Sequence, residues 1–94
     1  MALFVIIGTD GPEAPKLRLL HRTEHLQRLQ ALDAAGKVVL AGPFEDKTGS
    51  LIVIEADSLD EARAFAQGDP YVTYGVFTHV KVKPFRQVLP APGA

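Results

Sequence analysis

The chain has 94 residues, no cysteine, and 10 basic against 11 acidic side chains, for a net charge of −1. The absence of cysteine excludes disulfides, thiolate zinc sites and a cysteine nucleophile. The balanced charge argues against nucleic acid or an anionic membrane as a partner. The length fits one domain. A hydrophobic content of 47% with a mean hydropathy of +0.09 is high for so small a body, which favours burial of apolar surface between copies.

No stretch of the sequence predicts a membrane span or a secretion signal. The start of the chain lacks a basic segment followed by a long apolar run. The longest apolar runs, such as residues 51–54, are far shorter than a bilayer requires. We therefore expect a cytoplasmic protein with no membrane partner.

The first half of the chain predicts a strand, a helix and a second strand. Residues 2–8 form a β-branched run that is apolar on both faces, and residues 9–15 have the Asp-Gly-Pro chemistry of a loop. A helix is expected over residues 16–35, with Gly36 as its stop, followed by a strand over residues 37–43. The apolar stripe of this helix is expected at Leu19, Leu26, Leu29 and Leu32.

The second half predicts a strand, a shorter helix and a final strand. Residues 49–56 are again apolar on both faces. Ser58 and Glu61 have the spacing of a capping box, and the helix runs to about Gln67. Residues 69–71 read as a turn, and residues 75–83 as a strand with clean alternation.

In that last strand the sequence predicts one core face and one wet face. Phe77 and His79 are expected on the wet face with Lys81 and Lys83. The domain is expected to span residues 1–88, with residues 89–94 as a flexible tail.

The order β-α-β-β-α-β predicts an α+β, ferredoxin-like fold, in which a four-stranded antiparallel sheet carries both helices on one face. Two helices cover only one face, yet the strands at 2–8 and 49–56 are apolar on both. The uncovered face therefore needs an apolar partner. The simplest partner is a second copy of the chain, so we predict a homodimer that packs sheet against sheet.

Few side chains could carry chemistry, and His25 with Asp69 is the strongest pair. His25 lies at the border of the apolar stripe, where a half-buried imidazole can serve as general acid or base. Asp69 follows the second helix and precedes Pro70, a position that can aim its carboxylate across the helical layer. A carboxylate on one ring nitrogen fixes the tautomer and raises the basicity of the other. A packing histidine and a turn-forming aspartate remain open as alternatives.

The other candidates carry weaker signals. Arg22 could hold an anionic group or be a solvated helix charge, and Tyr71 and Tyr74 could wall a pocket for a planar ligand or simply pack. His21 and His25 have the i, i+4 spacing of two metal ligands, but no third ligand is evident. We expect no metal and no cofactor.

Several short motifs, in order, make the chain resemble the YciI-like (YCII-related) family of small bacterial proteins. The first half carries Arg22-x-x-His25-Leu26-x-x-Leu29, Gly36, Ala41-Gly42-Pro43 and Gly49-Ser50. The second half carries Asp69-Pro70-Tyr71, Gly75-Val76 and Val82-x-Pro84-Phe85. Each piece is short, but their order and spacing together are specific. The resemblance covers nearly the whole chain.

The resemblance implies a ferredoxin-like fold and dimers of the dimeric α/β-barrel type. It also implies an active site centred on a His–Asp pair, which falls on His25 and Asp69 here. Some relatives are dehydrochlorinases of chlorinated hydroxyquinols, and the wider superfamily includes muconolactone isomerases and cofactor-free monooxygenases.

Our leading hypothesis is a small cofactor-independent enzyme that moves a proton on a small cyclic, oxygenated molecule, by elimination (as in dehydrochlorination) or isomerisation. His25 exchanges the proton and Asp69 orients it. The pocket would be shaped by Arg22, Phe44, Tyr71 and Tyr74. The alternatives are a non-catalytic ligand-binding or regulatory dimeric module, and metal binding through His21 and His25.

Overall fold

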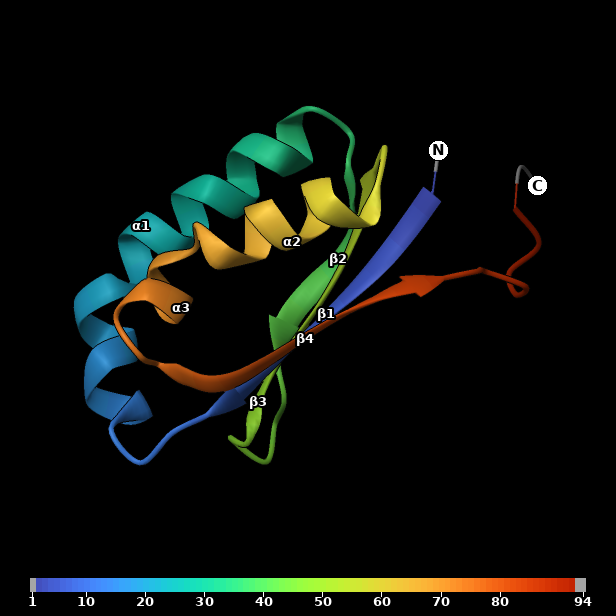
Figure 1. Cartoon of the computed structure of the whole chain (residues 1–94). Helices are drawn as coiled ribbons and strands as arrows, with labels where there is room; N and C mark the ends of the chain where they lie inside the picture. Colours follow the sequence, from blue (N-terminus) through green and yellow to red (C-terminus); the bar gives the residue numbers. More distant parts are fainter. Residues whose placement is uncertain (1, 93–94) are drawn as a thin grey trace.

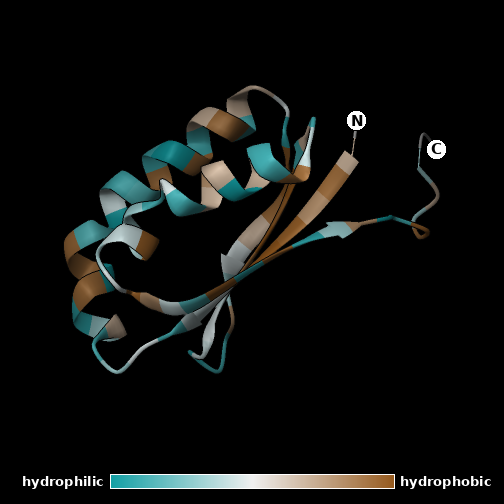
Figure 2. Cartoon of the chain, viewed as in Figure 1, coloured by the Kyte–Doolittle hydropathy of each residue, from teal (hydrophilic) through white to brown (hydrophobic). Residues whose placement is uncertain are grey.

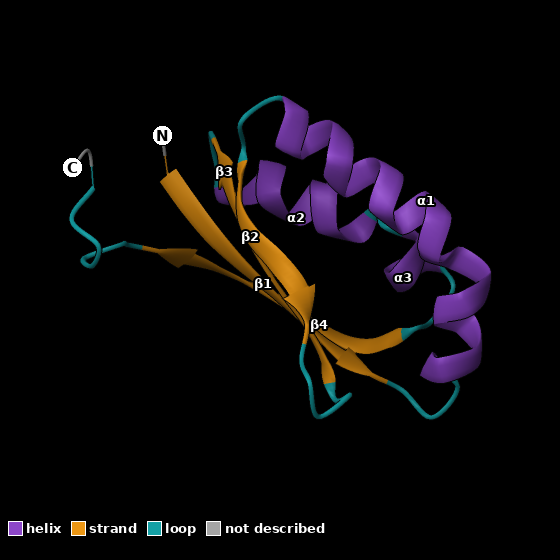
Figure 3. Ribbon diagram, turned by 180° about the vertical axis from the view of Figure 1, so that it is seen from behind, coloured by secondary structure: helices purple, strands orange, loops and turns teal. Residues whose placement is uncertain are grey.

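A computed structural model describes residues 2–92 and has one four-stranded antiparallel sheet, in the order β2-β3-β1-β4. The elements are β1 (Ala2–Asp10), α1 (Ala14–Ala34), β2 (Val38–Pro43), β3 (Gly49–Ala56), α2 (Leu59–Gln67), α3 (Pro70–Thr73) and β4 (Phe77–Phe85). All three helices lie on one face of the sheet, and the other face is open (Figures 1 and 3). The predicted ferredoxin-like α+β fold is confirmed.

The sequence signals for the end of α1 and for the start of α2 are both present in the structure. Gly36 adopts a φ of +76°, and its N–H donates to the Asp33 carbonyl while the Lys37 N–H donates to the Leu32 carbonyl. This left-handed stop at the end of α1 suits a glycine. At the start of α2, the Ser58 hydroxyl accepts from the Glu61 N–H at 3.1 Å. The capping hydrogen bond predicted from the sequence is therefore present.

The segment predicted as a turn at residues 69–71 is instead the start of a one-turn helix, α3. Asp69 is its N-cap, with extended backbone, and Pro70 stands at its first position. Asp and Pro suit those two positions, because the carboxylate accepts an otherwise unpaired N–H and proline has none to lose. The last strand consequently begins at Phe77, two residues later than predicted.

The core lies between the sheet and the helices, but the predicted apolar stripe of α1 is only partly buried. Leu29 is buried and Leu32 packs against the core formed by Phe4, Ile6, Ile52 and Ile54. Leu19 is 79% exposed and lines the rim of a pocket instead. Leucine at a helical spacing therefore marks the core only where the sheet lies beneath the helix.

Phe77 is buried, against the prediction that it shares a wet face with His79. The pairing of β1 with β4 shifts register between Thr9 and Asp10, and this irregularity changes the face on which Phe77 lies. The Phe77 ring sits over Gly8, where an added Cβ would come within 2.5 Å of it. His79 itself is exposed.

The open face of the sheet is apolar at its centre and basic along one edge. Strand register aligns Val5 and Ile7 of β1 with Val53 and Leu51 of β3. The same rows continue into Lys83 and Lys81 of β4. Hydrophobic colour runs along β1 in Figure 2. Both faces of the central strands are therefore apolar, as the sequence predicts.

Beyond β4 the chain runs away from the helices (Figure 1). The Gln87 side chain donates to the Pro90 carbonyl in this segment. Of the predicted tail, Gly93 and Ala94 lie outside the described residues. Within residues 2–92, none of the helices is both long enough and apolar enough to span a bilayer.

We predict that Gly49→Ala destabilises the fold by about 3 kcal/mol, at the upper end of overpacking effects. A Cβ there would lie 2.0 Å from the Gly8 carbonyl oxygen, which is backbone and cannot rotate away. Urea unfolding followed by circular dichroism measures the change. Gly42→Ala is the matched control, because a Cβ there meets nothing within 4 Å, so its effect stays within about 0.5 kcal/mol. Equal stability of the two variants would contradict the prediction.

Candidate active site

The structure brings His25 and Asp69 together, although 44 positions separate them in the sequence. His25 Nδ1 lies 2.8 and 2.9 Å from the two carboxylate oxygens of Asp69. Both residues are buried, and His25 is only 6% exposed. The pair joins the middle of α1 to the N-cap residue of α3.

This contact fixes which ring nitrogen is free. A carboxylate only accepts hydrogen bonds, so Nδ1 of His25 carries a hydrogen and donates it. In the neutral imidazole, Nε2 is then the unprotonated nitrogen and can accept a proton. The Asp69 carboxylate stabilises the imidazolium that results. The arrangement can therefore supply a proton acceptor at Nε2 of His25, oriented by the Asp69 carboxylate.

Asp69 is itself held in place by its neighbours. Its Oδ1 accepts the Tyr71 N–H at 2.8 Å, which is the N-cap bond of α3. Arg28 Nη1 lies 3.7 Å from Oδ2 and donates to the Phe65 carbonyl at 3.1 Å. The carboxylate has therefore little freedom to turn away from His25.

Tyr71 forms one wall of the site. Its ring stacks on the His25 ring with centroids 3.8 Å apart and an interplanar angle of 5°. The edge of Phe77 supports it from another side, at 5.6 Å. Burial raises the pKa of the Tyr71 hydroxyl, against a smaller opposing effect from the Arg18 and Arg22 charges. Tyr71 is therefore a neutral, fixed ring beside the imidazole.

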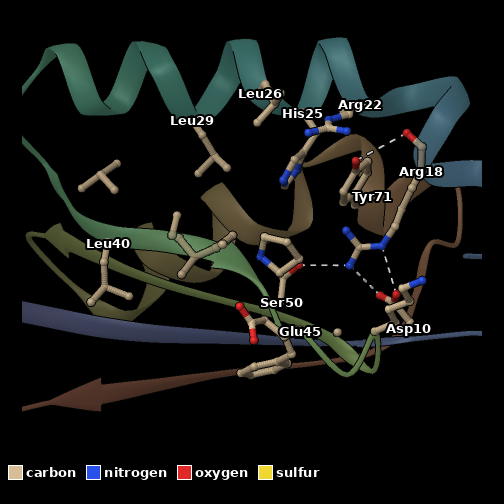
Figure 4. A pocket seen from close by; sticks show the side chains of 18 of the residues that line it. Asp10, Arg18, Arg22, His25, Leu26, Leu29, Leu40, Glu45, Ser50 and Tyr71 are labelled. Carbon is tan, nitrogen blue, oxygen red and sulfur yellow. Dashed lines mark hydrogen bonds and ion pairs between the residues drawn. The ribbon is translucent and has the colours of Figure 1, made fainter. Parts of the chain in front are cut away.

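His25 opens into a pocket of about 990 Å³ between α1 and the β2–β3 side of the sheet. Figure 4 shows its imidazole projecting from α1 into this space. Among the predicted pocket residues, Arg22, Phe44 and Tyr71 line it. Tyr74 does not line it and is 55% exposed.

Tyr74 instead pairs with His21, in a second stack beside the first. The His21 and Tyr74 rings lie 3.9 Å apart with an interplanar angle of 6°. His21 is half-buried in this stack. Across residues 2–92 there is no group of three or more His, Asp or Glu side chains arranged to hold a metal ion.

A network built on Arg18 lies in the same pocket and was not singled out from the sequence. Arg18 donates to both carboxylate oxygens of Asp10, from Nε at 3.0 Å and from Nη2 at 2.8 Å. Nη2 also donates to the Ser50 hydroxyl at 3.0 Å (Figure 4). The guanidinium lies 5.2 Å from the Tyr71 ring centroid. Arg18 precedes His25 by two helical turns, and that spacing was the available signal.

Comparison with known proteins agrees with this architecture. The model of the YCII-related domain matches residues 2–86. The chain belongs to the YCII-related family. Protein YciI of Escherichia coli O6:H1 is 41% identical, with 92% of this chain and 98% of YciI covered. An uncharacterized protein of Haemophilus influenzae is 37% identical, with 90% of this chain and 97% of that protein covered.

One solved structure is similar to this chain in both sequence and fold. It is the 5-chloro-2-hydroxyhydroquinone dehydrochlorinase TftG from Burkholderia phenoliruptrix AC1100, in complex with 2,5-dihydroxybenzoquinone. It is 31% identical, covers 90% of this chain and 94% of TftG, and has a TM-score of 0.80. The fold is thus of the dimeric α/β-barrel type that the resemblance implied.

We predict that the Tyr71 hydroxyl titrates above the ordinary tyrosine pKa of about 10. The folded protein then holds this proton more tightly than the unfolded chain. The stability that Tyr71 contributes is complete below pH 10 and is lost as the pH rises through its folded pKa.

The chain has two tyrosines, so a Tyr74→Phe variant leaves Tyr71 as the only phenol. Ultraviolet titration of its phenolate absorbance measures the midpoint directly. Tyr71→Phe is the control for stability and loses this part of the alkaline destabilisation. A midpoint at or below 10 would refute the prediction.

Proposed function

We propose that this member of the YCII-related family is a small cytoplasmic enzyme that moves a proton on a cyclic, oxygenated small molecule without a cofactor. The observation that most directly supports this proposal is the 2.8 Å contact between Nδ1 of His25, which lines the pocket, and the Asp69 carboxylate. It leaves Nε2 as the proton acceptor. A positioned base of this kind contributes about 10²–10⁴-fold to a reaction rate.

The side chains around His25 suit a flat, oxygenated ring. Tyr71 offers a fixed aromatic wall beside the imidazole. Arg22 and Phe44 lie along the same pocket, and the guanidinium of Arg22 can neutralise an oxyanion that forms as the proton leaves. We assign these three residues to substrate binding. Tyr74 is assigned a supporting role, because it stacks on His21 outside the pocket.

Elimination of hydrogen chloride is the reaction that the likeness to TftG favours. On the keto tautomer of a chlorinated hydroxyquinol, the carbon that carries chlorine is saturated. His25 would accept a ring hydroxyl proton, the O–H electrons would form a ring carbonyl, the adjacent double bond would shift towards the C–Cl carbon, and chloride would leave with the C–Cl pair. This sequence balances without an oxidant or reductant. Isomerisation uses the same base and returns the proton at another carbon, so the site serves either outcome.

A non-catalytic binding module is the competing function. It would use the same pocket and the same His25–Asp69 contact, but only to hold the fold and the ligand. The two functions differ in one measurable respect, because only an enzyme needs a free Nε2 on His25.

The test is release of chloride from 5-chloro-2-hydroxyhydroquinone, together with deuterium uptake by non-chlorinated hydroxyquinones. We predict that His25→Ala lowers either rate by at least about 10²-fold. Asp69→Asn lowers it as well, because an amide in place of the carboxylate no longer stabilises the imidazolium. His79→Ala is the matched control, since His79 is exposed on β4 and outside the pocket. Turnover that survives His25→Ala would remove the proposal.

We also propose that two copies associate through the open faces of their sheets. The supporting observation is the apolar row of Val5, Ile7, Leu51 and Val53 on the face that no helix covers. In a single chain Val5, Ile7 and Leu51 stay partly exposed, and a second copy can bury them with the same row of its own. The flanking Lys81 and Lys83 would lie at the edge of that contact.

We predict that the protein sediments as a dimer, at twice the 10.2 kDa of one chain. Val5→Glu introduces a charge at the centre of the open face and shifts the mass to that of the monomer. Leu20→Glu is the control, because Leu20 is exposed on α1 and lies outside the open face. Analytical ultracentrifugation of the three proteins decides the matter, and an unchanged dimer of Val5→Glu would refute the sheet-to-sheet contact.

A further inference from the structure

We infer that the pocket takes an amphipathic ligand: a ring with an anionic oxygen group at its polar end, and an apolar extension along α1. This rests on the proposed function for the position of the reacting ring. It goes further, because it names the charge and the shape of the molecule. The argument comes from how polar and apolar side chains divide the pocket.

The polar end is organised before any ligand arrives. Asp10 and Ser50 hold the Arg18 guanidinium through Nε and Nη2. Among the described residues, Nη1 of Arg18 has no hydrogen-bond partner, so its two N–H groups are free to donate. Asp10 holds the Arg18 guanidinium in place, but its carboxylate also neutralises the positive charge of that guanidinium.

Arg22 supplies the uncompensated charge at this end. Within the part of the chain that the structure describes, no carboxylate lies within 4.0 Å of its guanidinium. It lines the pocket one helical turn from both Arg18 and His25. Two guanidinium groups next to a base favour a ligand oxygen with negative charge.

The other end of the pocket is apolar. Figure 4 shows the polar side chains Asp10, Arg18 and Tyr71 at one end, and Leu26 and Leu29 further along α1 beyond His25. The apolar part of the lining includes Leu26, Leu29, Val38, Ala41 and Ile52. The other two carboxylates of the lining, Asp33 and Glu45, are exposed.

The size of the pocket agrees with an extended ligand. Its volume of about 990 Å³ is at the upper end of the range for sites that bury drug-sized molecules. A single substituted ring held at Arg18 and His25 would leave the Leu26 and Leu29 end in contact with water. An apolar chain on the ring would displace that water and cover Leu26, which is 37% exposed.

The experiment measures binding of 4-alkylbenzoates of increasing chain length, from methyl to octyl, by isothermal titration calorimetry. These probes carry a carboxylate on a flat ring and a linear apolar chain. We expect affinity to rise two- to fourfold for each added methylene. We also expect the matching 4-alkylbenzamides, which are neutral, to bind at least about tenfold more weakly. No variant is needed for either comparison.

Variants then assign each end to its residues. Leu26→Gln flattens the dependence on chain length, whereas Leu20→Gln does not, because Leu20 is exposed on the same helix outside the pocket. Arg18→Met weakens all the acids by a similar factor. If that variant fails to fold, the comparison of acid with amide still tests the anionic end.

Each result bears on one part of the inference. An affinity that does not change with chain length overturns the apolar extension, and equal binding of acids and amides overturns the anionic group. Because the readout is binding, neither result depends on turnover. His25→Ala is expected to retain the chain-length dependence, which separates this inference from the failure of the proposed reaction.

Discussion

The site depends on one carboxylate that serves two parts of the structure at once. Asp69 accepts the Nδ1 hydrogen of His25 and, on the same oxygen, the N–H of Tyr71. The first bond places the hydrogen of the neutral imidazole on Nδ1, so that Nε2 is the nitrogen without one. The second begins α3 and thereby sets the position of the Tyr71 ring that stacks on His25. The positions of His25, Tyr71 and α3 therefore all depend on Asp69.

The sequence was sufficient for the fold because its signals there are local and redundant. Gly36 and Ser58 set helix ends through backbone geometry alone, and two-faced apolar strands imply an open sheet. The His25–Asp69 contact was also foreseeable, since few other residues could act as base and partner. The two side chains lie 2.8 Å apart in the structure.

Three features of the structure could not be predicted from sequence patterns: the Arg18 network, the burial of Phe77 and the position of Tyr74. The Arg18 network joins Asp10 at the end of β1 to Ser50 at the start of β3, and strand pairing alone brings them together. No periodicity reports such a contact, because each residue has a plausible solvated or mid-strand interpretation. Phe77 was misplaced for a related reason: a register shift at Thr9 is invisible to simple alternation. Tyr74 was expected to wall the pocket, yet as the C-cap of the one-turn helix it stacks on His21.

The twin ring stacks between α1 and α3 have a consequence for how the site holds together. A helix of four residues is not stable in isolation, so α3 depends on its N-cap Asp69 and on packing of Tyr71 against α1. The His21–Tyr74 stack lies outside the pocket, and the His25–Tyr71 stack lies within it. The His25–Asp69 pair thereby belongs to a small packed unit with α3, to which Tyr74 contributes from outside the pocket.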